Sequence, residues 1–242
     1  MKIVTSDIKS FVKNLEFTNG KYDVKDIFRE VISLTTFIIQ AYMIGNKEYL
    51  EQYNTLLKKY TDDEQLRLKE LVLELAEIYN KQTEPVDLMT DIFGELGLGN
   101  KNTGQFFTPT NISDLMAKIV GIDANTESDI SKYGYTTLHE PTSGAGGMIL
   151  AYARELKSKG YNPSKNLFVV AWDIDILCTY MTYVQLAMYD IPAVVVNGDT
   201  LALKEHFTLY TPQYYLGMWN FKTNQIKPNV ENVEKEEIRK GA

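Results

Sequence analysis

Residues 138–147 read LHEPTSGAGG, an apolar segment that ends in the acid Glu140 and then turns through glycines into a helical stretch. Strand–turn–helix units of this kind build parallel α/β sheets, in which ligands bind at the carboxyl ends of the strands. The glycines would let backbone N–H groups approach a ligand at the start of the helix, although the same pattern also occurs in tight connections that bind nothing. No lysine follows in the spacing GxxxxGK[ST], which disfavours a nucleoside-triphosphate loop.

The acid at the end of this first strand narrows the kind of ligand. Phosphate sites use uncovered N–H groups at this position, because these groups and the helix dipole favour negative charge. A carboxylate instead suits a cationic group, such as the amino group of a methionine moiety. Glu140 therefore favours a site for an amino-acid-bearing ligand over a phosphate site.

Acids also follow the next two predicted strands. Residues 171–175 read AWDID, and an acid at this place holds ribose hydroxyls in nucleotide-binding sheets. We expect Asp175 to cap the following helix and Asp173 to be the ribose ligand. No nearby histidine supports a metal site here. Residues 197–201 read NGDTL, in which Asp199 offers a carboxylate to the exocyclic amine of an adenine ring.

Hydrophobic patterns divide the chain into a helical first part and an alternating second part. In the first hundred residues the apolar positions recur with a helical period, and Thr61 and Glu64 have capping-box spacing. Predicted helices there span 23–44, 48–60, 61–80 and 86–96. After a helix over 111–120, strands alternate with helices, which predicts an α/β class with a parallel sheet. The strands span 136–140, 167–172, 193–197 and 207–210, and the helices between them span 147–159 and 177–189.

Composition and charge limit the class of protein. The 242 residues are 44% hydrophobic and 24% charged, as in ordinary globular domains, and no apolar run is long enough for a membrane span. The single cysteine, Cys178, lies among apolar neighbours and is predicted to be a packing residue, consistent with a reducing cytoplasm. With 25 Lys+Arg against 32 Asp+Glu, the formal charge is −7. A DNA-binding role would therefore need a local basic face or a partner.

Three motifs in order resemble those of a known family. The segments 104–109 (GQFFTP), 140–147 (EPTSGAGG) and 198–201 (GDTL) are similar to the modification subunits of type I restriction-modification systems. More broadly, they resemble the γ-class adenine-N6 DNA methyltransferases. The resemblance covers roughly residues 87–215. It implies a Rossmann-like S-adenosylmethionine-dependent methyltransferase fold preceded by an N-terminal α-helical region. It also implies DNA as the substrate, bound through a specificity or other partner subunit, and a homo-oligomer is a further possibility.

The resemblance also implies roles for individual residues. Thr108 and its neighbours would hold the carboxylate of the methionine moiety, and Glu140 with the glycine loop would surround the rest of that moiety. Asp173 would take the ribose, Ile174 would pack on the adenine, and Asp199 would accept from the adenine amine. The full set expected to bind S-adenosylmethionine is Phe107, Thr108, Pro109, Glu140, Thr142, Gly144, Gly146, Asp173, Ile174, Asp199 and Thr200.

The catalytic motif of this family departs from its usual form. The family places (N/D)PP(Y/F) at the end of the fourth strand, where an acceptor side chain holds the amine of a flipped-out adenine and an aromatic ring stacks on the base. This chain has Thr211, Pro212, Gln213 and Tyr214 at that place. A threonine hydroxyl lacks the planar carbonyl of Asn or Asp, and loss of one positioned acceptor costs on the order of 100-fold in rate. Tyr214 could stack on a base or serve only in packing.

The segment after this motif is shorter than in the resembled family. Only 28 residues follow Tyr214, so we expect an incomplete sheet whose open edge is covered by residues 219–221 or by a second copy. We divide the chain into a helical region (1–100), a methyltransferase-like α/β domain (101–222) and a charged tail (223–242).

Three functions remain open from the sequence. The chain is a partner-dependent DNA adenine methyltransferase, a cofactor-binding regulatory module without catalysis, or a methyltransferase with another acceptor. Cofactor motifs alone do not identify the acceptor.

Overall fold

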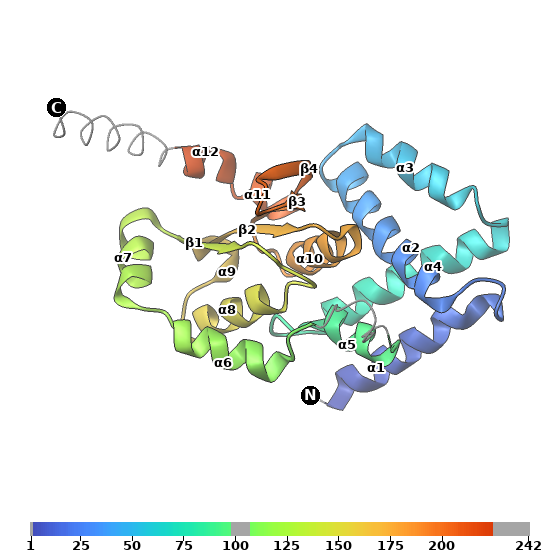
Figure 1. Cartoon of the computed structure of the whole chain (residues 1–242), viewed down its shortest axis with the longest axis horizontal. Helices are drawn as coiled ribbons and strands as arrows, with labels where there is room; N and C mark the ends of the chain where they lie inside the picture. The colour runs from blue at the N-terminus through green and yellow to red at the C-terminus, as the bar shows by residue number, and fades with distance from the viewer. Residues whose placement is uncertain (1, 98–106, 225–242) are drawn as a thin grey trace.

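The structure, a computed structural model, describes residues 2–97 and 107–224, and it contains a helical N-terminal region followed by a four-stranded sheet with its own helices (Figure 1). No helix in these two ranges is long and apolar enough to cross a membrane. The N-terminal helices are α1 (Lys2–Asn14), α2 (Val24–Ile38), α3 (Lys47–Leu57), α4 (Asp62–Asn80) and α5 (Leu88–Glu95), with a 3-10 turn at Leu15–Thr18 and a π-helical turn at Ile39–Met43. The later helices are α6 (Thr110–Val120), α7 (Ala124–Tyr133), α8 (Gly147–Ser158), α9 (Pro163–Asn166), α10 (Ile176–Met188), α11 (Pro212–Leu216) and α12 (Trp219–Asn224).

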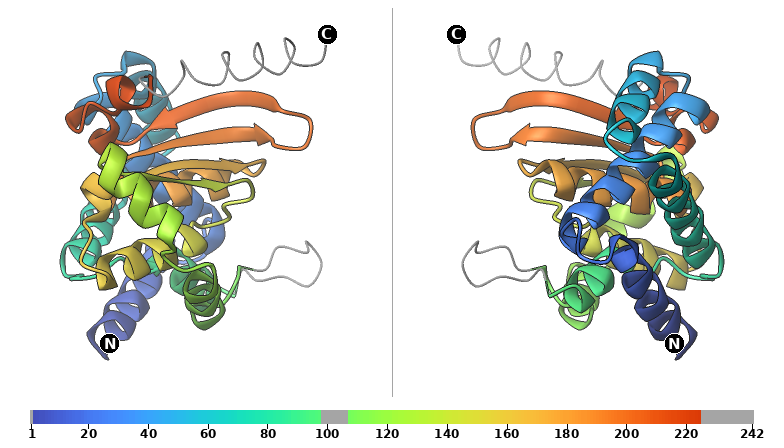
Figure 2. Two further views of the ribbon diagram at one scale, coloured as in Figure 1. Left: turned by 90° about the vertical axis from the view of Figure 1, so that its left-hand side faces the viewer. Right: turned by 90° about the vertical axis from the view of Figure 1, so that its right-hand side faces the viewer.

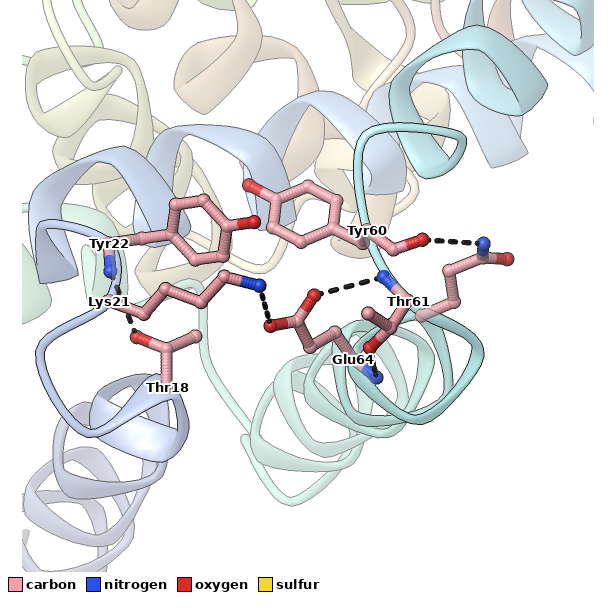
Figure 3. Close-up of polar contacts among 7 residues, drawn as sticks. Thr18, Lys21, Tyr22, Tyr60, Thr61 and Glu64 are labelled. Atoms are coloured by element: carbon pink, nitrogen blue, oxygen red, sulfur yellow. Dashed lines mark hydrogen bonds and ion pairs between the residues drawn. The ribbon is translucent and has the colours of Figure 1, made fainter.

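The start of α4 shows how local sequence sets the helix boundaries. The Thr61 side chain accepts from the backbone N–H of Glu64, and the Glu64 carboxylate accepts from the backbone N–H of Thr61, so the predicted capping box is confirmed. Lys21, in the turn before α2, forms a 2.7 Å ion pair with Glu64 (Figure 3). Beside it, the rings of Tyr22 and Tyr60 meet edge to face with their centroids 5.1 Å apart. Together, these contacts join α4 to the turn that precedes α2.

Two predicted helices differ from the structure at their ends. The helix expected over 23–44 is α-helical to Ile38 and continues as the π-helical turn. The helix expected over 86–96 begins only at Leu88, because Asp87 is its N-cap and the hydroxyl of Tyr189 bonds both the N–H and the carbonyl of Val86. The polar helix α7 was not predicted, since Ile130 is its one buried residue and its helical pattern is correspondingly weak.

The strands are β1 (Thr136–Glu140), β2 (Leu167–Asp173), β3 (Ala193–Asp199) and β4 (Lys204–Tyr210), in the spatial order β1-β2-β3-β4. The pairs β1–β2 and β2–β3 are parallel, but β4 is antiparallel to β3. The prediction of a parallel sheet is therefore wrong for β4. Four residues connect β3 to β4, and a parallel connection needs a dozen or more, so the two strands form a hairpin, which extends beyond the helices in Figure 2.

The two faces of the sheet are covered differently. On one face, Val169 and Ala171 of β2 belong to a large core shared with α8, α10 and the N-terminal helices. Figure 1 shows α10 between the sheet and α2. On the other face, Phe168 joins a small cluster with Tyr135 and the fully buried Trp219, whose ring stacks on Phe168 at 5.4 Å. The mixed α/β class with a helical N-terminal region is thus confirmed, and one continuous core joins the two parts.

Candidate cofactor-binding site

The register of the parallel strands brings three sequence motifs to one edge of the sheet. Glu140 at the end of β1 lies beside Ala171 of β2, and Asp173 at the end of β2 lies beside Asn197 of β3. Asp199 ends β3 two residues further on. The glycine loop and the two acids that follow the next strands are therefore neighbours, as the alternating pattern predicts.

Buried side chains of α10 hold the glycine loop from below. Thr182 donates its hydroxyl hydrogen to the carbonyl of Gly144 at 2.9 Å, and Gln185 donates to the carbonyl of Ala145 at 2.6 Å. From the side, the Asp173 carboxylate accepts from the N–H of Gly144 at 2.8 Å. Both buried α10 side chains are fully shielded from solvent. These bonds hold the N–H of Gly144 and the carbonyls of Gly144 and Ala145, so the protein's own side chains fix the conformation of the loop.

The glycines leave space that a side chain would fill. A Cβ built on Gly144, which has φ +56°, would lie 3.1 Å from the ring of Phe107. One built on Gly146, with φ +95°, would lie 3.3 Å from the Thr182 hydroxyl. A Cβ on Gly198 would lie 2.5 Å from the carbonyl oxygen of Lys204. Close approach of backbone and rings therefore explains why glycine occupies these positions.

A cavity of about 490 Å³ opens at this edge of the sheet. Its volume lies in the range of small-molecule and cofactor sites. Carboxylates and an exposed isoleucine, Ile174, meet there, which gives the cavity both polar acceptors and an apolar wall. The lining residues are Phe107, Pro141, Thr142, Gly144, Asp173, Ile174, Asp175, Cys178, Gly198, Asp199, Thr200 and Leu201.

A second, smaller cavity of about 90 Å³ adjoins the first and shares Phe107, Thr142 and Gly144 with it. Its lining combines the glycine loop with Asp87 and Thr90 of the helical N-terminal region. The lining residues are Asp87, Thr90, Phe107, Thr108, Thr142, Ser143, Gly144, Ala145, Gly147 and Met148. Because the two cavities share these three residues, we treat them below as one elongated site.

Burial changes the pKa of two carboxyl groups at this edge of the sheet. Partial burial raises the pKa of the Glu140 and Asp173 carboxyls, and the bond from Thr142 N–H and the bond from Gly144 N–H oppose this rise. Asp199 is organised differently, because one of its oxygens accepts from the N–H groups of Leu201 and Ala202, both at 3.0 Å. Its second oxygen accepts no protein hydrogen bond among those seen in the described part of the chain. The site is therefore rich in hydrogen-bond acceptors.

Most of the residues predicted to bind a cofactor line these two cavities. Asp173, Ile174, Asp199 and Thr200 line the larger cavity and Thr108 lines the smaller one, while Phe107, Thr142 and Gly144 line both. Pro109, Glu140 and Gly146 line neither cavity. Pro109 is the N-cap of α6, and Gly146 packs against Thr182. Residues 104–106 of the motif GQFFTP lie outside the described residues. Asp175 caps α10 and Cys178 is buried, as predicted, and both also line the larger cavity.

The four residues expected to form the catalytic motif are not brought to this edge. Because β4 is antiparallel, its carboxyl end pairs with the amino end of β3, so that Tyr210 lies opposite Val194. Thr211 is fully buried there, where its hydroxyl donates to the carbonyl of Ile191 and accepts from the N–H of Ala193, both at 2.9 Å. The structure therefore places Thr211 away from the cofactor residues, and a catalytic role of this motif stays a prediction.

The neighbours of Thr211 also have packing roles. Pro212 begins α11 and is buried, while Gln213 donates to the carbonyl of Ser164 at 3.2 Å. The ring of Tyr214 lies 4.8 Å from that of Tyr210 and 6.1 Å from that of Phe168. The segment closes the far face of the sheet, beside Trp219, rather than facing the cavities.

Comparison with known proteins identifies the family. The family model for N-6 DNA Methylase matches residues 95–232, which is more than half of the chain. The chain belongs to the N-6 DNA methylase family. The matched range of this methylase-family chain begins at the end of α5 and includes both cavities except for Asp87 and Thr90.

Other comparisons add little. A search of curated proteins found no match. Among solved structures, a protein from Listeria monocytogenes described as a class I S-adenosylmethionine-dependent methyltransferase is similar at 17% identity and a TM-score of 0.40. The similarity covers 73% of this chain and 54% of that protein, so the methylase-family chain spans about half of the length of the protein it matches.

Sequence reasoning missed one group of site residues. Asp87 and Thr90 reach the smaller cavity from α5, about 50 residues before the glycine loop in sequence. Asp87, including its carboxylate, is buried, with 1% of its surface exposed. An acid in front of the apolar turn 88–93 is a signal for a helix cap, and nothing in that local pattern indicates that it also faces the loop.

Proposed function

We propose that this chain binds S-adenosylmethionine in the two adjoining cavities at the carboxyl edge of β1–β3. The observation that carries the proposal is that the glycine loop, Asp173 and Asp199 meet in one cavity of about 490 Å³. When bound, the cofactor would supply an activated methyl group. The larger cavity suits its nucleoside and the smaller cavity suits its methionine end.

The roles proposed for single residues follow from their surroundings. Asp199 already uses one oxygen to hold the turn after β3, which leaves the other for the adenine amine. Ile174 is 64% exposed beside the cavity and offers an apolar surface to the adenine ring. Asp173 is fixed by the N–H groups of Gly144 and Asp175 and keeps free lone pairs for ribose hydroxyls. Thr108 lines the smaller cavity and would contact the methionine carboxylate.

A substitution at Asp199 tests this site sharply. Asp199→Asn retains an oxygen for the N–H groups of Leu201 and Ala202 but replaces the free acceptor with an NH₂ donor. We expect the dissociation constant for S-adenosylmethionine to rise by about tenfold or more, as for loss of a hydrogen bond with an unpaired donor left behind. Asp190→Asn makes the same change in the exposed turn before β3 and serves as the control. Wild-type affinity in Asp199→Asn would show that the site is misassigned.

We further propose that the chain acts as a binding module whose Thr211 motif does not carry out methyl transfer. This is supported by the burial of Thr211 at the opposite edge of the sheet. The second candidate is adenine-N6 methylation of DNA with a partner subunit, which family membership supports. With a formal charge of −7, tight DNA binding in that case would need a partner or a local basic face on the chain.

An assay with radiolabelled S-adenosylmethionine and DNA, with and without a specificity subunit, separates the two candidates. The binding-module proposal predicts cofactor binding without methyl transfer under either condition. Transfer that is abolished by Thr211→Val would contradict it and would support a catalytic role for that motif. Transfer that survives Thr211→Val would assign catalysis to other residues.

A further inference from the structure

The Asp87 carboxylate has one oxygen without a hydrogen-bond partner although it is buried. Its Oδ1 accepts from the N–H of Thr90 at 3.1 Å and from the Gln185 amide at 2.9 Å. Its Oδ2 is shielded from solvent and accepts no hydrogen bond from residues 2–97 or 107–224. In the described part of the chain, no lysine, arginine or histidine forms an ion pair with Asp87. Buried carboxylates are normally paired, so this oxygen lacks the partner that its burial demands.

The unpartnered oxygen lies against the start of α8, beside the smaller cavity that Asp87 lines. Asp87 lines that cavity, and a Cβ built on Gly147 would lie 2.4 Å from Oδ2. The helix dipole of α8 favours negative charge there but contributes little by comparison with a direct ionic partner. Glu140, the acid that the sequence pattern assigns to a cationic group, lines neither cavity. Asp87 is therefore the one acid among the described residues that line the smaller cavity, where we proposed the methionine end.

We infer that Asp87 binds the α-amino group of the methionine moiety, an inference that rests on the proposed cofactor site. A primary ammonium group would donate to Oδ2 and neutralise the buried charge. Gln185, which bonds both Asp87 and the carbonyl of Ala145, holds the carboxylate and the glycine loop in one network. Asp87, the N-cap of α5, would thereby link the cofactor to the helical N-terminal region.

The inference is tested with S-adenosylhomocysteine and its deamino analogue, in which hydrogen replaces the α-amino group. Calorimetric titration of the full wild-type chain should show binding of S-adenosylhomocysteine that is about tenfold to a hundredfold tighter than that of the analogue. In Asp87→Asn, the Oδ1 bonds to Thr90 and Gln185 remain. This variant should bind S-adenosylhomocysteine about tenfold to a hundredfold more weakly and distinguish the two ligands by less than about threefold. Asp91→Asn, on the exposed side of the same helix, should behave as the wild type.

Thermal unfolding separates binding of the amine from a merely structural role. Without ligand, Asp87→Asn should melt at or above the wild-type temperature, because it removes an unpaired buried charge, and it should lose most of the shift produced by S-adenosylhomocysteine. A structural role alone predicts a lower melting temperature for ligand-free Asp87→Asn and intact discrimination between the two ligands, which would overturn the inference.

The remaining outcomes are also decisive. Equal wild-type affinity for the two ligands would overturn the inference without any variant and would leave the cofactor site intact. Loss of discrimination in Glu140→Gln, with Asp87→Asn behaving as the wild type, would assign the amine to Glu140 instead. No wild-type binding of either ligand would overturn both this inference and the proposed function.

Discussion

Single residues at this site are fixed by contacts that differ in kind. Gly147 is required by space, since the Asp87 carboxylate lies where its side chain would be. Thr211 is required by hydrogen bonds, since its hydroxyl joins the turn before β3 to the end of β4. The acids Asp173 and Asp199 could be predicted from the sequence because each follows a strand. Asp87 could not, because its approach to the glycine loop depends on how α5 packs against α8 and α10.

Gly147→Ala should destabilise the fold. The added methyl group would collide with the Asp87 carboxylate, which is buried and cannot move into solvent. We expect a loss of about 1–3 kcal/mol in the free energy of unfolding, measured by urea denaturation. Gly94→Ala in α5 is the control, because no atom lies within 4 Å of its Cβ position. It should gain about 0.5–1 kcal/mol from helix propensity. Equal stability of Gly147→Ala and wild type would show that the carboxylate lies elsewhere.

Thr211→Val should reduce stability and leave cofactor binding unchanged. The valine keeps the shape but leaves the N–H of Ala193 and the carbonyl of Ile191 without their partner. The expected cost is about 1–3 kcal/mol in thermal or urea unfolding. Thr211→Ser retains the hydroxyl and should lose less. If Thr211→Val weakened S-adenosylmethionine binding while remaining fully stable, the structural assignment of this residue would be wrong.

Among the elements, α10 and the β3–β4 hairpin determine the site. α10 supplies Thr182 and Gln185 to the glycine loop, and its Asp175 cap faces the larger cavity. The hairpin brings β4 to the sheet but sends its end away from the cavities. The strand positions could be predicted from apolar runs. The direction of β4 was predicted wrongly, although the short connection after β3 carries the signal, because only hairpins are closed by so few residues.

Gln185→Leu should loosen the element that supports the loop. Gln185 is fully buried, and its amide bonds Asp87 and the carbonyl of Ala145, while its oxygen accepts from Tyr79 and from the N–H of Met89. Leucine matches the size but leaves several buried groups unpaired. We expect a loss of about 2 kcal/mol or more in chemical denaturation. Gln82→Leu, at a partly buried glutamine just after α4, should cost about 1 kcal/mol or less. Similar losses in the two variants would contradict a central role for Gln185.

At the scale of the whole molecule, one core joins the helical region to the sheet. The two cavities lie at the carboxyl edge of β1–β3, and the helical region contributes to the smaller one. The division into helices and an α/β sheet could be predicted from hydrophobic periodicity, since each element is long enough to show its period. The family could be recognised from three motifs, of which residues 104–109 precede the first strand and residues 140–147 and 198–201 lie at strand ends. The joint contribution of the two regions to the smaller cavity could not, because contacts between distant segments leave no local pattern.

The stability of the ligand-free chain should respond to pH through Glu140. Burial raises the pKa of this carboxyl above its usual value of 4.5, so the folded state binds its proton more tightly than the unfolded state. The stabilising contribution is complete below the unfolded pKa and is lost as the pH rises through the folded pKa. Glu140→Gln should therefore show a smaller loss of stability than the wild type between about pH 4 and pH 6. Identical pH profiles in urea denaturation would contradict this.

The proposals for this chain depend on an S-adenosylmethionine site at the carboxyl edge of β1–β3. Calorimetric titration of the wild-type chain with S-adenosylmethionine tests it most directly. We expect saturable binding with a stoichiometry near one, because the two adjoining cavities would hold one cofactor molecule in each chain. No heat and no saturation at high ligand concentration would contradict it and would show that the glycine loop only connects a strand to a helix.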